Sequence, residues 1–396
     1  MIRIRKNLWS FVLLEILLLA PVTSGAQESA QKSILADSVE ISLLTCSPHE
    51  EIYSLYGHTA IRFHNLRNGD DFAFNWGIFN FRQSYFVLRF VFGATDYELG
   101  VMPFGRFCDY YRKWGSSVTE QVLNLTADEK RSLFAAMMEN YQPQNRTYRY
   151  NFFFDNCATR PRDMIEANVQ GKVMYAPRED YEPTFREMIR ECTGHHEWAT
   201  FGNDLLLGVR ADMKTTRQEQ EFLPGNLLYD FDYAQIRAAD GSIRPLLKER
   251  RMAVNPGVQM REQDFPLTPR ECGWLLLAVT VFLALWEWKR KKTFKYYDAL
   301  LMLLMGLAGC VLTVMIFSQH PATSINLQLL LFNPVHLFFL PAVLRRRRTT
   351  RYWVFLIVTT SLFLVGGVLQ QYADGMYILA LCLLIRFASN MINNKN

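Results

Sequence analysis

Five apolar segments follow one another in the last third of the chain, and they constrain the fold more than any other feature. Each is close to the length of about 20 residues that a helix needs to cross a bilayer, although the first and last are short. A single water-soluble domain is therefore excluded. The predicted membrane spans cover residues 273–288, 297–317, 327–344, 352–369 and 376–388.

Basic residues cluster on one side of these segments. Residues 289–292 are all Lys or Arg, as are residues 345–348, whereas the alternate loops 318–326 and 370–375 contain neither. Positively charged loops stay in the cytoplasm. We therefore expect a multi-pass protein of the bacterial inner membrane, with residues 27–270 in the periplasm and the C-terminus in the cytoplasm.

The N-terminus has the layout of a secretory signal peptide. Three basic residues precede a short apolar run from Leu8 to Leu19, and Ser24-Gly25-Ala26 supplies small residues for cleavage after Ala26. Residues 1–26 are therefore predicted to be a signal peptide. An uncleaved anchor is the alternative, but the apolar run is short for a span.

The net charge of +5 conceals a strong partition along the chain. Residues 271–396 carry 12 Lys/Arg against four acidic residues, a net charge of +8, while residues 27–270 have a net charge of −5. The positive charge therefore belongs to the membrane loops, so we expect no nucleic-acid partner. Disorder is excluded by the 50% hydrophobic content.

The sequence pattern of the exported part, residues 27–270, predicts strands first and helices later. An Asn68–Asp71 hairpin turn separates two of the strands, and Thr126-Ala127-Asp128-Glu129 is a capping box that opens a helix. A second helix is predicted through Met164 and Ile165. The predicted extended segments cover residues 40–44, 58–63, 72–76 and 148–154. We predict a periplasmic domain over 27–240, a connector over 241–270 and a membrane domain over 271–396.

Cys157 is the most informative single residue. It follows Asp155 and Asn156, both good helix N-caps, so its sulfur is expected in the first helical turn, where a thiolate is favoured. His58, after Gly57 at the start of a strand, could deprotonate this thiol, and Asn75 on the neighbouring strand could orient the imidazole. A buried structural cysteine and an ordinary strand-end histidine are the alternatives.

Two Cys-x-x-His pairs offer a weaker signal. Cys46 with His49, and Cys192 with His195, together have the residue types of a zinc site, but the pairs lie far apart in the chain. A disulfide between Cys46 and either Cys192 or Cys108 is the favoured interpretation in an oxidising compartment. We expect no metal and no cofactor.

Six ordered motifs stand out in the exported part, at residues 56–62, 75–79, 148–153, 155–160, 208–212 and 222–224. Over about residues 40–235, the chain resembles a family of membrane-bound lipoprotein N-acyltransferases in these motifs. The order of His58 before Cys157 also resembles circularly permuted papain-like proteins related to NlpC peptidases and lecithin:retinol acyltransferase. One departure is Ser47-Pro48-His49, where a Pro-Gly pair is expected.

The resemblance implies an α+β fold, with a circularly permuted papain-like periplasmic domain before an all-α membrane domain of about five helices. It implies transfer of a fatty acyl chain from a phospholipid to the N-terminal amine of diacylglyceryl-cysteine lipoproteins. Cys157 would form the thioester, His58 would act as base and then acid, and Asn75 would orient it. Arg160, Tyr150 and Asn156 are expected to bind substrate, with a structural ion pair as the alternative for Arg160.

Two other functions remain open from the sequence. An NlpC-like thiol amidase acting on cell-wall peptides would use the same Cys157 and His58, but it gives no reason for the membrane segments. A non-enzymatic envelope scaffold with a degenerate papain-like domain would not need the thiol of Cys157.

Overall fold

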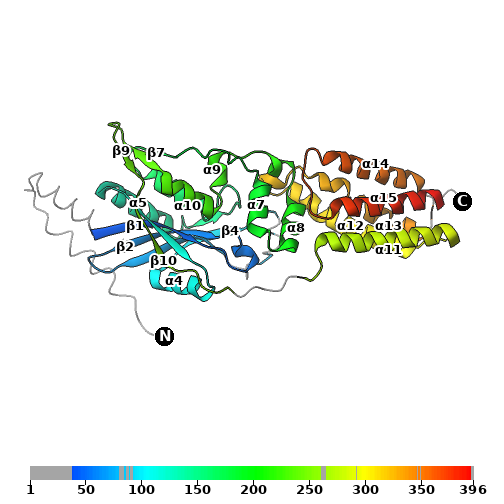
Figure 1. Cartoon of the computed structure of the whole chain (residues 1–396), viewed down its shortest axis with the longest axis horizontal. Helices are drawn as coiled ribbons and strands as arrows, with labels where there is room; N and C mark the ends of the chain where they lie inside the picture. Colours follow the sequence, from blue (N-terminus) through cyan, green and yellow to red (C-terminus); the bar gives the residue numbers. More distant parts are fainter. Residues whose placement is uncertain are drawn as a thin grey trace, which may run out of the picture.

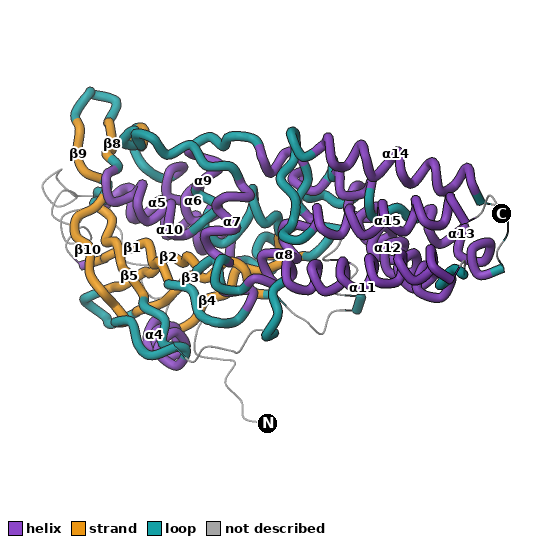
Figure 2. Tube along the Cα trace, turned by 45° about the vertical axis from the view of Figure 1, so that its right-hand side comes forward, coloured by secondary structure: helices purple, strands orange, loops and turns teal. Residues whose placement is uncertain are grey.

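The computed structural model describes residues 38–393 except 80–83, 86–88, 90–91, 260–264, 291, 346 and 348. The predicted signal peptide, residues 1–26, lies outside the described residues. The molecule is elongated, with a sheet-containing domain at one end and a bundle of helices at the other (Figures 1 and 2). The predicted α+β class is thereby confirmed.

A seven-stranded sheet forms the centre of the N-terminal domain, in the order β10-β5-β1-β2-β3-β4-β6. All neighbouring strands are antiparallel. The first three predicted strands are confirmed, because they lie within β1, β2 and β3. The strands are β1 (Val39–Cys46), β2 (His58–Asn65), β3 (Asp71–Ile78), β4 (Asp96–Pro103), β5 (Val118–Leu123), β6 (Thr147–Arg149) and β10 (Leu247–Val254).

Helices cover both faces of this sheet. Side chains alternate between the faces of a strand, so Ile41 and Leu43 of β1 join one core while Leu44 and Cys46 join another. The first core includes residues of α5 (Ala127–Tyr141), α6 (Thr159–Ala167) and α10 (Pro224–Tyr233), and the second includes residues of α4 (Phe104–Lys113). The sheet therefore separates two sets of buried side chains.

Both helices predicted in this domain are present. Thr126 caps α5 through its side chain, and Glu129 completes the predicted capping box. The helix predicted through Met164 and Ile165 is α6. The predicted extended segment 148–154 is only partly right, because β6 ends at Arg149 and residues 152–154 form turns.

The predicted connector, residues 241–270, is partly wrong. Its first part forms β9 (Ile243–Pro245), which joins β7 (Lys172–Met174) and β8 (Gln235–Arg237) in a small sheet, and then β10 of the large sheet. Four charged residues, Lys248–Arg251, hide the apolar alternation of β10 in the sequence. Charged side chains are typical of such an edge strand, where they discourage pairing with another chain.

Short helices lie between the large sheet and the membrane helices. In Figure 1, α7 and α8 occupy this middle region of the molecule. The short helices of the N-terminal region are η1 (Ile52–Ser54), α7 (Phe185–Thr193), α8 (Glu197–Leu206), η2 (Val209–Asp212) and α9 (Arg217–Gln220).

The C-terminal region is helical at all five predicted spans. Among the described residues, three stretches are long and apolar enough to cross a membrane, namely 269–290, 295–316 and 321–344, and two shorter apolar helices follow. The third predicted span is not one regular helix, because η3 (Pro321–Thr323) and η4 (Leu327–Leu330) precede α13. The helices are α11 (Pro269–Arg290), α12 (Lys295–Ile316), α13 (Val335–Leu344), α14 (Thr350–Gly366) and α15 (Met376–Asn393).

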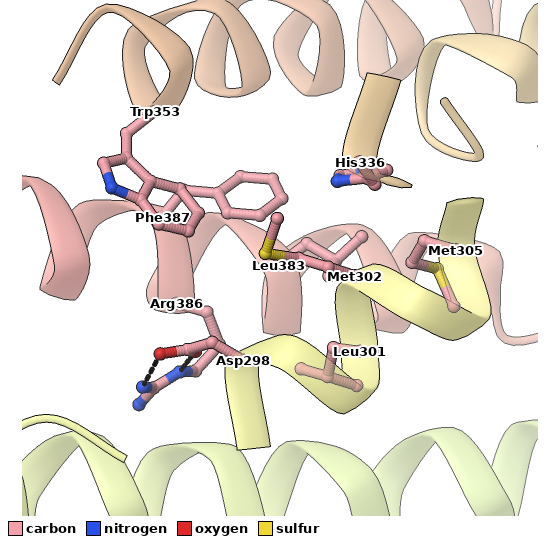
Figure 3. A pocket seen from close by; sticks show the side chains of 9 residues that line it. All are labelled: Asp298, Leu301, Met302, Met305, His336, Trp353, Leu383, Arg386 and Phe387. Carbon is pink, nitrogen blue, oxygen red and sulfur yellow. Dashed lines mark hydrogen bonds and ion pairs between the residues drawn. The ribbon is translucent and has the colours of Figure 1, made fainter. Parts of the chain in front are cut away.

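A buried ion cluster joins three of these helices. Arg386 of α15 is 1% exposed and donates to Asp298 of α12 (Nε to Oδ1, 2.7 Å) and to Glu287 of α11 (Nη2 to Oε1, 2.8 Å). Figure 3 shows the Arg386–Asp298 pair beside a small pocket that Trp353 and His336 also line. Charged side chains inside a membrane region are tolerated when they are paired in this way.

Candidate active site

His58 and Asn75 meet at one end of the large sheet. His58 is the first residue of β2, Asn75 lies on the adjacent strand β3, and His58 Nε2 is 2.5 Å from Asn75 Oδ1. An amide oxygen only accepts hydrogen bonds, so Nε2 of His58 carries a proton and donates to it. Nδ1 of His58 is then the nitrogen that can accept a proton. The imidazole also stacks on Tyr111 of α4, with ring centroids 6.5 Å apart.

Asn156 fixes the turn that carries Cys157. Its Oδ1 accepts from the backbone N–H groups of Ala158 (2.8 Å) and Thr159 (3.0 Å), and its carbonyl accepts from Arg160 (3.2 Å). This is the geometry of an N-cap, so Cys157 is the first residue after the cap, although the regular helix α6 begins at Thr159. The N-terminal dipole of α6 therefore favours a negative sulfur.

Cys157 and His58 are hydrogen-bonded and electrostatically matched. Burial raises the pKa of the Cys157 thiol, but the positive charge and hydrogen bond of His58, together with backbone N–H groups of Thr59 and Cys157, hold that pKa below its ordinary value of 9.0. Burial lowers the pKa of His58, yet Cys157 and Asn75 raise it above its ordinary value of 6.5. The lowered pKa of the thiol and the raised pKa of the imidazole both favour a thiolate–imidazolium pair.

Gly77 lies beside this pair in a backbone conformation that favours glycine. It is the extra residue of a β-bulge between Trp76 and Ile78, and its φ is +101°, which side chains of L-residues rarely adopt. A Cβ at this position would lie 3.6 Å from the Cβ of Cys157 and 3.7 Å from Cε1 of His58. Gly77 therefore lies where the thiol and the imidazole approach each other.

Three tyrosines, Tyr97, Tyr148 and Tyr150, lie close enough to Cys157 for its charge to act on them. Tyr97 and Tyr150 stack with centroids 4.1 Å apart, and burial, together with the charge of Cys157, raises the pKa of Tyr97 to about 12. The same causes raise the pKa of Tyr148 and Tyr150. The phenols are therefore neutral and supply a largely apolar wall. Tyr148 is 6% exposed, and its hydroxyl has no hydrogen-bond partner among the described residues.

The three residues predicted to bind substrate have different surroundings. Tyr150 lies in this tyrosine wall. Arg160 instead pairs with Asp155 (Nε to Oδ1, 2.5 Å) and lies over the ring of Tyr148 at 3.6 Å, which is the structural ion pair considered as its alternative. Asn156 is buried, and its Nδ2 donates to backbone carbonyls at 2.8 and 2.9 Å, so it holds the turn rather than facing a ligand.

The other cysteines lie in separate environments. All seven are unpaired, so the expected bridge from Cys46 to Cys192 or Cys108 is not formed. Cys46 is buried with α4 and hydrogen-bonds to Tyr111, whereas Cys192 packs in a different apolar cluster. The residues described contain no group of three or more potential metal ligands.

Sequence reasoning missed Gly77 and the Thr59 N–H group. Gly77 lies in the motif of residues 75–79 and directly follows a predicted strand, but neither signal indicates the bulge or the positive φ. The hydrogen bond from the Thr59 N–H group to Cys157 depends on how two distant segments of the chain pack together.

Two family models match this chain. Residues 26–190 match the Lnb N-terminal periplasmic domain, and residues 260–396 match the Lnb transmembrane domain. No curated protein and no solved structure matches. The two matched regions occur in the same order as the sheet domain and the helical region described above. This chain therefore belongs to the Lnb family of membrane-bound lipoprotein N-acyltransferases.

Proposed function

We propose that this protein moves a fatty acyl chain from a phospholipid to the α-amino group of diacylglyceryl-cysteine lipoproteins through a thioester on Cys157. The observation that carries the proposal is the contact of Cys157 with His58, which in turn contacts Asn75, together with the lowered pKa of the thiol. A thiolate is a strong nucleophile, and splitting transfer into two steps lowers each barrier.

In the first step, the Cys157 thiolate attacks the carbonyl carbon of the phospholipid ester. The tetrahedral intermediate collapses with loss of the glycerol oxygen, which takes a proton from the His58 imidazolium, so the products are a thioester and a lysophospholipid. Asn75 holds the imidazole through Nε2, which leaves Nδ1 for this proton transfer.

In the second step, the free amine of the lipoprotein attacks the thioester. His58 Nδ1 accepts a proton from the amine, an amide forms, and Cys157 leaves as a thiolate.

The proposal extends to the fold of the periplasmic domain and to the membrane topology. We infer that the periplasmic domain is a permuted papain-like fold, since His58 and Asn75 precede Cys157 in the chain. We also infer five membrane spans, with the C-terminus in the cytoplasm of a bacterial inner-membrane protein. The periplasmic domain extends through β10, and the remaining residues up to α11 form the connector.

Expression in cells depleted of their own apolipoprotein N-acyltransferase tests this function. Mass spectrometry of lipoprotein N-termini is expected to reveal N-acylation with the wild-type protein and with Cys192→Ala, because burial raises the pKa of Cys192 to about 11 and keeps it a thiol. Cys157→Ala and His58→Ala are expected to leave the amines free.

Free amines in cells that contain the wild-type protein would refute the proposal. Cleaved cell-wall peptides under those conditions would favour a thiol amidase. An unchanged phenotype with Cys157→Ser would favour a scaffold.

A further inference from the structure

Two outer loops of the membrane region pack into the periplasmic domain. The loop between α12 and α13 donates from Asn326 Nδ2 to the carbonyl of Leu205 at 2.8 Å. The loop between α14 and α15 donates from Gln370 Nε2 to the carbonyl of Leu207 at 3.0 Å. The backbones are in contact as well, since Val209 N–H donates to the carbonyl of Ile325 at 2.7 Å. We call this region, where the two loops meet residues 205–209, the junction.

The two loops also hold each other. Gln370 Nε2 donates to Asn326 Oδ1 at 3.0 Å, and Gln370 Oε1 accepts from the Leu327 N–H at 2.7 Å. Asn326 and Gln370 are 6% and 1% exposed. Buried amides with all their groups bonded form a rigid and specific network, because a lost partner would leave a polar atom unpaired in a dry site.

The periplasmic side of the junction is equally well fixed. Arg186 of α7 is fully buried and pairs with Asp204 (3.0 Å) and Asp212 (2.7 Å). It also donates to the carbonyls of Leu207 and Gly208, at 3.0 and 3.3 Å. The segment that receives the membrane loops is thereby held in one conformation.

The same junction reaches the turn that carries Cys157. Asn151 Nδ2 donates to the carbonyl of Gln319, in the α12–α13 loop, at 3.3 Å. Asn151 and Asp155 exchange backbone hydrogen bonds of 3.0 and 2.9 Å, which close the short loop immediately before Asn156 and Cys157. The membrane loop therefore contacts the base of the catalytic turn directly.

Apolar side chains beside the junction indicate where the bilayer surface lies. Phe317 and Val368, which follow the outer ends of α12 and α14, are 75% and 88% exposed, and Ile325 in the α12–α13 loop is 65% exposed. Such exposure is unfavourable in water and is accounted for by contact with lipid. The loop that contacts the catalytic turn is therefore at the level where a phospholipid ester and a lipoprotein amine are found.

We propose that Asn326 and Gln370 are positioning residues that hold Cys157 at the height of the membrane-embedded acyl donor and acceptor. The membrane region is then part of the catalytic arrangement rather than an anchor alone. This inference rests on the proposed acyl transfer, for which both substrates lie in a bilayer. A small displacement of reacting groups can cost about 100-fold in rate.

The test uses the full-length protein reconstituted in phospholipid vesicles with a diacylated lipopeptide. The Asn326→Ala/Gln370→Ala double variant is compared with Asn333→Ala, a matched change in the same loop, where Asn333 Oδ1 accepts from Val335 N–H. Two properties are measured for each protein. The first is the rate of N-acylation of the lipopeptide, and the second is the rate of Cys157 alkylation by soluble iodoacetamide as a function of pH.

We expect the double variant to lose at least about 10-fold in N-acylation, with an unchanged alkylation profile, while Asn333→Ala retains both. If the double variant N-acylates the lipopeptide at the wild-type rate, this inference is overturned while the proposed function stands. A parallel loss of Cys157 alkylation would also overturn it, because the residues would then only support folding of the site. If the wild-type protein leaves the lipopeptide unacylated, the proposed function fails, and this inference fails with it.

Discussion

Replacing His58 by alanine removes the charge and the hydrogen bond that oppose burial at Cys157. In the wild-type protein, these interactions hold the pKa of the thiol below 9.0. Without the imidazole, burial dominates, so we expect the pKa to rise above 9.0. At pH 7 the sulfur is then at most about 1% thiolate, because pH 7 lies two or more units below the pKa.

The sign of the pH dependence follows from the reactive species. Only the thiolate is alkylated, so the rate increases with pH through the pKa of Cys157. The curve for the wild-type protein should therefore have its midpoint below pH 9, and that of His58→Ala above pH 9. Acyl transfer should fall about 100- to 10,000-fold, since the general acid–base group is also lost.

The assay is alkylation by iodoacetamide from pH 5 to about 10.5, followed by mass spectrometry of the peptide that contains Cys157, which separates it from the other cysteines. His64→Ala is the matched control, because His64 lies near the other end of β2. A midpoint for His58→Ala that coincides with that of the wild-type protein would refute the proposed coupling of the two groups.

Three further changes have defined expectations. Asn75→Ala removes the hydrogen bond to His58 Nε2, worth about 1.5–3 kcal/mol for a charged partner, and should slow transfer about 10- to 100-fold; an unchanged rate contradicts its orienting role. Gly77→Ala imposes strain of about 1–3 kcal/mol at φ +101° and should lower both the melting temperature and the transfer rate, which circular dichroism and kinetics would measure; normal values for both would refute the steric argument. Arg386→Ala leaves Glu287 and Asp298 unpaired and should destabilise the detergent-solubilised protein by about 3–5 kcal/mol; an unchanged unfolding midpoint would argue against the ion cluster.

The parts of the site that follow local rules could be predicted from the sequence. Asn156 is a good N-cap, and that alone places Cys157 at the start of a helix. The alternation of apolar residues placed His58 and Asn75 on adjacent strands. Their meeting with Cys157 could only be suggested, because it depends on how α6 packs at the end of the sheet.

The parts that depend on distant packing were not predictable. Four consecutive charged residues hid β10, which is a strand because β5 offers it a partner. Arg160 has the same sequence signal whether it faces a phosphate or pairs with Asp155, and only the fold distinguishes the two. The junction through Asn326 and Gln370 joins residues more than a hundred positions from their periplasmic partners, so no local pattern encodes it.

The most direct test of the account is detection of the acyl-enzyme itself. The full-length protein is incubated with phospholipid vesicles in the absence of an acceptor, and the peptide that contains Cys157 is analysed by mass spectrometry. We expect a fatty acyl group on Cys157 that neutral hydroxylamine removes and that a diacylated lipopeptide accepts as an amide. Acylation of a different residue, or lipopeptide acylation that persists in Cys157→Ala, would contradict the account.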